Sequence, residues 1–297
     1  MRFSLKNSIV FLVLSTLLYS SEIDIYTNSF DKTDDNESSN TIEQYVSGLF
    51  GLKAYHTNYL VISHMDTAPE GDIFQEKTNY IKTETKFQIS LRGDFTTNLF
   101  DSTQIWTGAY TQRSYWQLFV ESEPFRETNY MPEAFVTFPL NHQYDEYGIK
   151  AISFGFMHQS NGQKEFYGPD GLLDDPSRSW NRLYTKAYFQ WNKLLTNIMI
   201  WYPISSTGST NDNADIVDYY GYGLLEMKYA HKKLFTSLNA RYNVSTNKGA
   251  LELEMSYPIN NSKDIFYYFQ GFTGYGQSLI DYHNYVNQVG FGISLSR

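Results

Sequence analysis

The sequence predicts an all-β protein, a 12-stranded antiparallel transmembrane β-barrel. Aromatic residues make up 18% of the chain, with 26 Tyr and 21 Phe, yet the mean hydropathy is −0.45. Beyond about residue 20, no apolar run is long enough for a membrane-spanning helix. Many aromatic and polar residues without a long apolar run are typical of barrel strands, which alternate apolar outward and polar inward side chains. A soluble β-sandwich is the alternative, and this composition disfavours it.

Residues 1–20 are predicted to be a secretory signal peptide. Arg2 and Lys6 give a basic start, and the apolar run at 9–14 is too short to span a bilayer. Ser20 and Ser21 are small residues suited to cleavage. This segment is therefore excluded from the fold.

Residues 21–48 are predicted to be an acidic, mobile N-terminal segment without a packing partner, because they are rich in Asp, Glu, Ser and Asn. The barrel domain is expected to occupy 49–297. The formal charge of −9 disfavours nucleic-acid binding. The absence of cysteine excludes disulfides and thiolate chemistry.

Strand-like segments bounded by turn signals fill the rest of the chain, and their even number is expected for a single-chain outer-membrane barrel. The predicted strands are 50–63, 80–96, 103–119, 129–140, 148–161, 177–191, 194–204, 219–231, 233–244, 249–259, 265–276 and 286–297. The connections at 191–193 and 230–232 are interpreted as tight periplasmic turns, and 162–176 and 205–218 as longer outer loops. The end of strand 148–161 that carries His158 is therefore expected to point toward the outer leaflet.

His158 and Ser160 are the most informative residues of that strand. They are two positions apart and so project from the same face, where an imidazole beside a hydroxyl could form a nucleophilic pair. Ile152, Phe154 and Phe156 share this face, which is therefore predicted to contact lipid. A catalytic pair on the outside of the barrel suggests a lipid substrate.

Strand 177–191 adds Asn181 to the same outward surface. Its other face carries three cationic residues, which cannot face lipid cheaply and are predicted to line the lumen: Arg178, Arg182 and Lys186. The two strands flank one loop, so we expect them to be hydrogen-bonded neighbours. Asn181 could then orient the imidazole of His158 as the third member of a Ser–His–Asn triad.

An amide is neutral and stabilises an imidazolium less than a carboxylate does, so a cation at the oxyanion site is expected to compensate. Ser177 offers a hydroxyl oxygen, and the loop 162–176 offers carbonyls together with the carboxylates of Asp170, Asp174 and Asp175. Ca²⁺ prefers such oxygen ligands. Gly162 can present its N–H to an oxyanion because it has no side chain.

Each of these residues also has an ordinary interpretation. His158 could be an interfacial residue, Ser160 a turn former and Asn181 a polar residue of the rim, and outer loops are commonly acidic. The convergence of three polar side chains on a lipid-facing surface favours the catalytic interpretation, because unpaired polar groups are costly there.

Several segments resemble bacterial outer-membrane phospholipase A, and the similarity runs from about Trp106 to the C-terminus. The shared segments are 110–112, 116–117, 124–130, His158-Gln159-Ser160-Asn161-Gly162, 177–185 and 274–282. The resemblance implies a barrel whose active site faces the outer leaflet and hydrolyses acyl esters of phospholipids and lysophospholipids, with A1 and A2 specificity. It also implies activity only in a homodimer and only with Ca²⁺.

The resemblance assigns individual roles to residues of this chain. Ser160 would be the nucleophile, His158 the base and Asn181 the residue that orients it, with the N–H of Gly162 at the oxyanion. Calcium would lie at the dimer interface, bound by the Ser177 hydroxyl, a carbonyl at Gln163 and a carbonyl at Ser122 of the partner subunit. Gln112 would lie in the dimer interface within the membrane, where an amide can form a hydrogen bond across the two-fold axis.

The chain departs from the family pattern in four places, one of which is residues 22–48, a segment with no counterpart that aligns. The interval between His158 and Asn181 is lengthened within 163–175, and the position of Gln163 is often Arg, so other carbonyls of the loop are alternatives for that ligand. The sequence printed ends at Arg297 rather than at an aromatic residue.

Two rival functions are a passive porin and an adhesin or structural barrel with an inactive site. A lumen packed shut by its own charged side chains disfavours the porin: Arg182, Lys186, Glu226 and Lys228. The intact site residues disfavour the inactive barrel.

Overall fold

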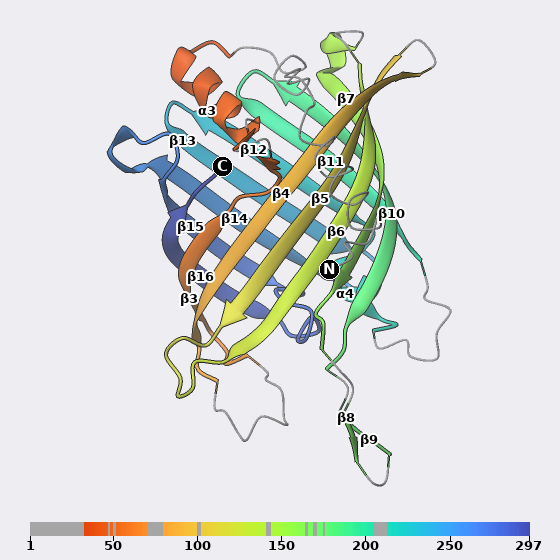
Figure 1. Cartoon of the computed structure of the whole chain (residues 1–297), viewed down its shortest axis with the longest axis vertical. Coiled ribbons are helices and arrows are strands. Elements are labelled where there is room, and N and C mark those ends of the chain that lie inside the picture. The colour runs from red at the N-terminus through yellow and green to blue at the C-terminus, as the bar shows by residue number, and fades with distance from the viewer. Residues whose placement is uncertain are drawn as a thin grey trace, which may run out of the picture.

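The computed structural model describes residues 33–46, 48–49, 52–69, 80–99, 102–140, 144–163, 166–168, 171–174, 176–204 and 213–297. Within these residues, twelve antiparallel strands form a closed barrel, so the predicted fold class is confirmed (Figure 1). The predicted signal peptide, 1–20, lies outside the described residues, as do residues 21–32. No helix in the described part of the chain is long and apolar enough to cross a membrane.

The barrel strands pair with their neighbours in chain order. They are β3 (Tyr59–Met65), β4 (Thr83–Leu99), β5 (Ser102–Trp116), β6 (Phe125–Pro139), β7 (Ile149–Ser160), β10 (Ser179–Trp191), β11 (Leu194–Ile204), β12 (Gly223–His231), β13 (Leu234–Asn243), β14 (Lys248–Pro258), β15 (Phe266–Gly274) and β16 (Val286–Ser294). The ring closes where β16 pairs with β3, with Val289 opposite His64.

The shorter elements lie at the two ends of the barrel. They are the helices α3 (Asn36–Val46) and α4 (Ile216–Tyr220), the strands β1 (Gly48–Leu49), β2 (Leu52–Ala54), β8 (Phe166–Gly168) and β9 (Gly171–Asp174), and the 3₁₀ turns η1 (Asp145–Tyr147) and η2 (Ile259–Asn261). Figure 1 shows the hairpin of β8 and β9 at the end of the barrel opposite α3. We call the end with β8, β9 and α4 the loop end, and the end with α3 the turn end.

The pattern of exposure along the strands follows their pleat. Phe154 on β7 is 50% exposed and Leu183 on β10 is 52% exposed, whereas the intervening Ser153 and Arg182 are buried. The outward side chains are therefore the apolar ones, as a lipid-facing surface requires. This confirms the assignment of faces made from the sequence.

The predicted tight turns are present at the turn end. Asn192 links β10 to β11 with φ of 52°, and Lys232 links β12 to β13 with φ of 51°. Two-residue hairpin turns need such left-handed residues, and Asn tolerates them well.

The prediction that residues 21–48 lack a packing partner is wrong for residues 33–46. Asp35 caps α3 by accepting the N–H of Ser38 at 2.7 Å, as expected for an acidic residue at this position. Thr41 donates to the carbonyl of Lys232 at 2.8 Å, and Ile42 is buried against Leu195, Ala230 and Phe235. The composition is acidic, but the buried residues of α3 find their apolar partners on the barrel rather than within the segment.

α3 also spans the opening of the barrel at the turn end. It contacts β12 on one side and β2 on the other, and β2 pairs with β4. β4 and β12 are six places apart in the ring of twelve, on opposite sides. The 11 residues of α3 are about 16 Å long at roughly 1.5 Å per residue.

Two predicted strands begin or break differently from the expectation. The segment 50–63 is divided into β2 and β3 because the side chain of Asn58 bonds to both the N–H and the carbonyl of Ser90, at 2.6 and 3.2 Å, in place of the backbone. The predicted strand 219–231 starts at Gly223, and Tyr220 instead ends α4, where its ring packs 5.3 Å from Trp180.

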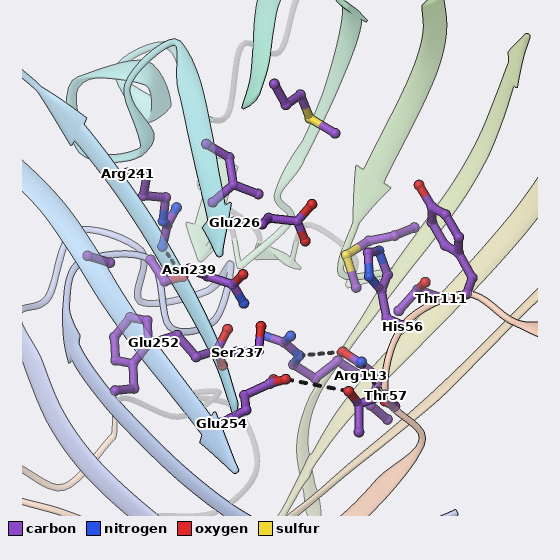
Figure 2. A pocket seen from close by; sticks show the side chains of 18 of the residues that line it. His56, Thr57, Thr111, Arg113, Glu226, Ser237, Asn239, Arg241, Glu252 and Glu254 are labelled. Carbon is purple, nitrogen blue, oxygen red and sulfur yellow. Dashed lines mark hydrogen bonds between the residues drawn. The ribbon is translucent and has the colours of Figure 1, made fainter. Parts of the chain in front are cut away.

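The lumen contains ion pairs and a cavity. Lys186 and Glu226 lie 2.8 Å apart. A cavity of about 230 Å³ remains between the strands, so the prediction of a fully packed lumen is only partly correct. Figure 2 shows His56, Arg113 and Glu254 directed into it.

Candidate active site

His158 and Asn181 face each other across β7 and β10. They are register partners in the two paired strands, as predicted, and Nδ1 of His158 lies 2.9 Å from Oδ1 of Asn181. Ser160 pairs with Ser179 one step nearer the loop end. The strand pleat places Ser160 on the same face as His158, and all three predicted triad residues are half-buried on the outward surface. The structure therefore brings the three predicted residues together.

Gly162 follows the site in a conformation that favours glycine. Its φ is 66°, and a Cβ at this position would lie 2.9 Å from Cε2 of Tyr130. Tyr130 is opposite Ser160 in the pairing of β6 with β7, so its ring forms a wall of the site. In the described part of the chain the N–H of Gly162 has no acceptor, and it remains available to a developing oxyanion.

Asn161 holds the two stems of the loop together, a role that the sequence analysis did not assign. It is 2% exposed, and its Oδ1 accepts the N–H of Gln163 at 3.2 Å and the N–H of Arg178 at 3.0 Å. Its Nδ2 donates to the carbonyl of Pro176 at 2.7 Å. Asn directly before a turn glycine is a signal for such a contact, but the partner residues cannot be read from spacing.

The expected calcium ligands of one chain lie on these two stems. Gln163 follows β7 and Ser177 precedes β10, and Asn161 binds the backbone beside both. A hydroxyl and a carbonyl oxygen suit Ca²⁺ chemically. The described residues contain no cluster of three His, Asp or Glu that could hold a metal without them. Asp170 and Asp175 lie outside the described residues, and the side chain of Asp174 is not described.

Ser122 and Gln112 lie outside the β7–β10 pair, in the turn between β5 and β6 and on β5, two strands from β7. Ser122 is exposed in the turn between β5 and β6, with φ of 68°. Gln112 is half-buried on the outward face of β5, where Tyr110 donates to its Oε1 at 3.1 Å and its Nε2 donates to Ser114 at 3.3 Å. These positions put a polar group on the lipid-facing surface of β5, which is what the expected role of Gln112 requires.

On the inward side of β7 and β10, a cation–aromatic contact holds the two strands together. The guanidinium of Arg182 lies 3.7 Å from the centroid of the Trp180 ring, and both side chains donate to Oε1 of Gln159 at 3.1 Å. Because these residues alternate with His158 and Asn181, the packing inside the barrel fixes the backbone that presents the site outside.

The connection 275–285 closes the lumen at the loop end, and the sequence analysis gave it no role beyond the family resemblance. Leu279 is fully buried, and Arg126 forms ion pairs with Asp281 at 3.3 Å and Glu84 at 3.1 Å. Tyr282 donates to the carboxylate of Asp215 in the connection before α4. Burial and this carboxylate raise the pKa of the Tyr282 hydroxyl, which therefore stays protonated as the donor.

Comparisons with known proteins agree with this geometry. A family model described as phospholipase A1 matches residues 36–295. The chain belongs to the phospholipase A1 family. It is 37% identical over 251 residues to the phospholipase A1 of Proteus vulgaris, covering 83% of this chain and 82% of that protein. The predicted family is therefore confirmed.

Solved structures of outer membrane phospholipases are similar to this barrel. The outer membrane phospholipase A of Escherichia coli has a TM-score of 0.72 at 35% identity, covering 83% of this chain and 99% of that one. The Salmonella typhi outer membrane phospholipase, solved as a dimer with bound calcium, has a TM-score of 0.70 at 34% identity, covering 88% and 99%. That protein therefore has both the assembly and the ion that the family resemblance implies for this chain.

Proposed function

We propose that this protein is a calcium-dependent phospholipase of the bacterial outer membrane. It hydrolyses acyl esters of phospholipids and lysophospholipids, with A1 and A2 specificity, and it uses Ser160, His158 and Asn181 as a triad. The observation that carries the proposal is the 2.9 Å contact between His158 and Asn181 on the lipid-facing surface, beside Ser160. Members of the matched family act on this class of substrate, and a site outside the barrel meets lipid directly.

The contact to Asn181 supports a role for His158 as the base. With Nδ1–H donated to the amide oxygen of Asn181, Nε2 is free to accept the proton of the Ser160 hydroxyl. The Ser160 oxygen then attacks the ester carbonyl, and His158 returns the proton to the departing alcohol. Water, deprotonated by His158, attacks the acyl group on Ser160, and the fatty acid leaves with the enzyme restored.

The developing negative charge is met by the N–H of Gly162. A donor fixed by the loop is effective because it is oriented before the reaction begins. Ser177 and Gln163 would hold the calcium ion, which when bound would supply positive charge near the oxyanion. The family resemblance implies a further ligand, the carbonyl of Ser122 of the partner subunit, and Ca²⁺ needs more oxygen ligands than one hydroxyl and one carbonyl.

Assembly would then control activity. A monomer would offer half of the calcium site, and the homodimer, with Gln112 in its interface, would complete it. The active site would face the outer leaflet. Ion pairs across the lumen, such as Arg126 with Glu84, disfavour the alternative of a passive porin.

The proposal is tested by fatty-acid release from phospholipid–detergent micelles by the refolded full chain. We expect release in Ca²⁺, none in chelator, and recovery when Ca²⁺ is restored. Ser160→Ala should reduce the rate by about 10³-fold or more, as expected when a serine nucleophile is removed. Ser245→Ala changes an exposed serine at the same end of the barrel and should leave the rate unchanged. Substantial release by Ser160→Ala, or release unaffected by chelator, would remove the nucleophile or the metal from the mechanism.

A further inference from the structure

Asn213 lies outside the triad and the expected calcium ligands, yet its side chain contacts the backbone that carries them. It is 5% exposed, and its Oδ1 accepts the backbone N–H of Ser179 at 2.9 Å. Ser179 is the first residue of β10, two residues after Ser177 and two before Asn181. One side chain thus holds the backbone midway between the expected calcium ligand and the residue that orients His158.

The end of β10 needs this contact because, in the part of the chain that the structure describes, β10 begins two residues before its first pair with β11. On one side, the pairing of β10 with β7 continues as far as Ser179 opposite Ser160. On the other side, the described pairing with β11 ends at Asn181 opposite Ile204. A backbone N–H beyond the end of a neighbouring strand loses its acceptor. The amide oxygen of Asn213 supplies the acceptor for the N–H of Ser179.

Asn213 is itself held in place by contacts of the residues that lead into α4 and of α4 itself. Its carbonyl accepts the N–H of Ile216 at 3.1 Å, and Tyr282 donates to the neighbouring Asp215. Asn243 on β13 donates to the carbonyl of Val217 at 2.9 Å. Contacts from β13 and from the connection 275–285 therefore fix the acceptor before substrate arrives.

We propose that Asn213 is a positioning residue for the reaction, which acts through the N–H of Ser179 on Ser177 and Asn181. The inference rests on the phospholipase function proposed above. Without this acceptor the backbone N–H of Ser179 loses its hydrogen-bond partner, and strand ends with fewer hydrogen bonds open more readily. The reacting groups tolerate little displacement, so the rate falls although Asn213 touches no substrate.

The matched pair Asn213→Ala and Asn213→Asp tests the proposal, because Asp retains an acceptor and Ala does not. In the refolded full chain with Ca²⁺, Asn213→Ala should lower kcat about tenfold with little change in KM, the effect expected from one lost hydrogen bond. Hydrogen exchange of a peptide spanning 176–182 should become faster by about the same factor. Asn213→Asp should restore both quantities.

A second variant weakens the contact between Asn213 and Ser179 indirectly. Tyr282→Phe removes the donor to Asp215 and leaves Asn213 unchanged. Exchange at 176–182 and kcat should change in the same direction as in Asn213→Ala, by a smaller factor.

Three results would overturn the role of Asn213. They are parental exchange at 176–182 in Asn213→Ala, faster exchange confined to 213–220, and a kcat that Asn213→Asp does not restore. Failure of the proposed function gives a different pattern, in which fatty-acid release survives Ser160→Ala. Release that is lost in Ser160→Ala but unchanged in Asn213→Ala counts against Asn213 alone.

Discussion

The inward and outward faces of the β7–β10 pair differ in the number of their polar side chains and in their surroundings. On the inward face, polar groups are numerous and bonded to one another, as Lys186 is to Glu226 at 2.8 Å. On the outward face, Phe154, Phe156 and Leu183 are exposed. Polar groups there gather near the loop end, where His158 meets Asn181. We therefore expect the inward pairs to support the barrel and the outward pair to serve the proposed reaction.

The largest effect on stability is expected from breaking an inward pair. Lys186→Met leaves the Glu226 carboxylate buried, although Lys228 at 3.7 Å and Asn197 at 3.1 Å still contact it. We expect a loss of about 3 kcal/mol in the free energy of unfolding, at the lower end for broken buried pairs. Urea unfolding in lipid vesicles measures this, with Lys263→Met on an exposed lysine as the control.

The double variant Lys186→Met with Glu226→Gln sharpens this test. Removing the unpaired carboxylate should recover part of the loss, and together with the single variant Glu226→Gln the cycle gives the coupling between the two side chains. If Lys186→Met were as stable as Lys263→Met, the inward pair would contribute no more than a surface charge.

The opposite result is expected for the outward pair. Asn181→Ala should lower kcat between about tenfold and a hundredfold, because His158 keeps its ring but loses the contact that orients it. The free energy of unfolding should be unchanged, since no buried partner charge is left behind. Activity and unfolding are measured on the same preparation.

Thr185→Ala is the matched control for Asn181→Ala, because Thr185 shares its face of β10 nearer the turn end. It should alter neither quantity. If Asn181→Ala were fully active but less stable, the outward pair would support the barrel rather than the reaction.

The barrel and the placement of the three proposed triad residues could be predicted because both depend on a period of two along single strands. Alternation in 148–161 and 177–191 was sufficient to place His158, Ser160 and Asn181 together, since one loop joins the two strands. The roles of Asn161 and Asn213 were not predicted. Each depends on a side chain meeting the backbone of another segment, and the sequence does not show which N–H groups lie beyond the end of a strand.

The composition of the N-terminal segment led to a wrong prediction, because contacts with the barrel stabilise residues 33–46. Residues 33–46 are acidic and polar, and on their own they would not fold. The barrel supplies what the segment lacks, since Ala230 and Phe235 cover Ile42 and Lys193 meets two carboxylates. The same reasoning explains why Tyr220 was assigned to a strand, since its partner Trp180 is distant in sequence.

A third polar contact, between Lys193 and two carboxylates, is exposed to water rather than buried or lipid-facing. Breaking it should have the smallest effect on stability. Nζ of Lys193 lies 2.7 Å from Asp34 and 2.7 Å from Asp35, and its hydrogen bond lowers the pKa of Asp35 from 3.8 to about 2. A lowered pKa means that the contact favours the docked helix above pH 4 and that this contribution is lost as the pH falls toward 2. Exposed ion pairs are weak, so Lys193→Ala should only modestly speed hydrogen exchange across 33–46, with Lys263→Ala unchanged. Acidification should lower the protection factors across 33–46 in the parent, and lower them less in Lys193→Ala, where Asp35 keeps only its bond to the N–H of Ser38. Equal exchange in all proteins at every pH would show that Ile42, Ser38 and Thr41 hold α3 alone, and that charge in water adds nothing to what burial provides.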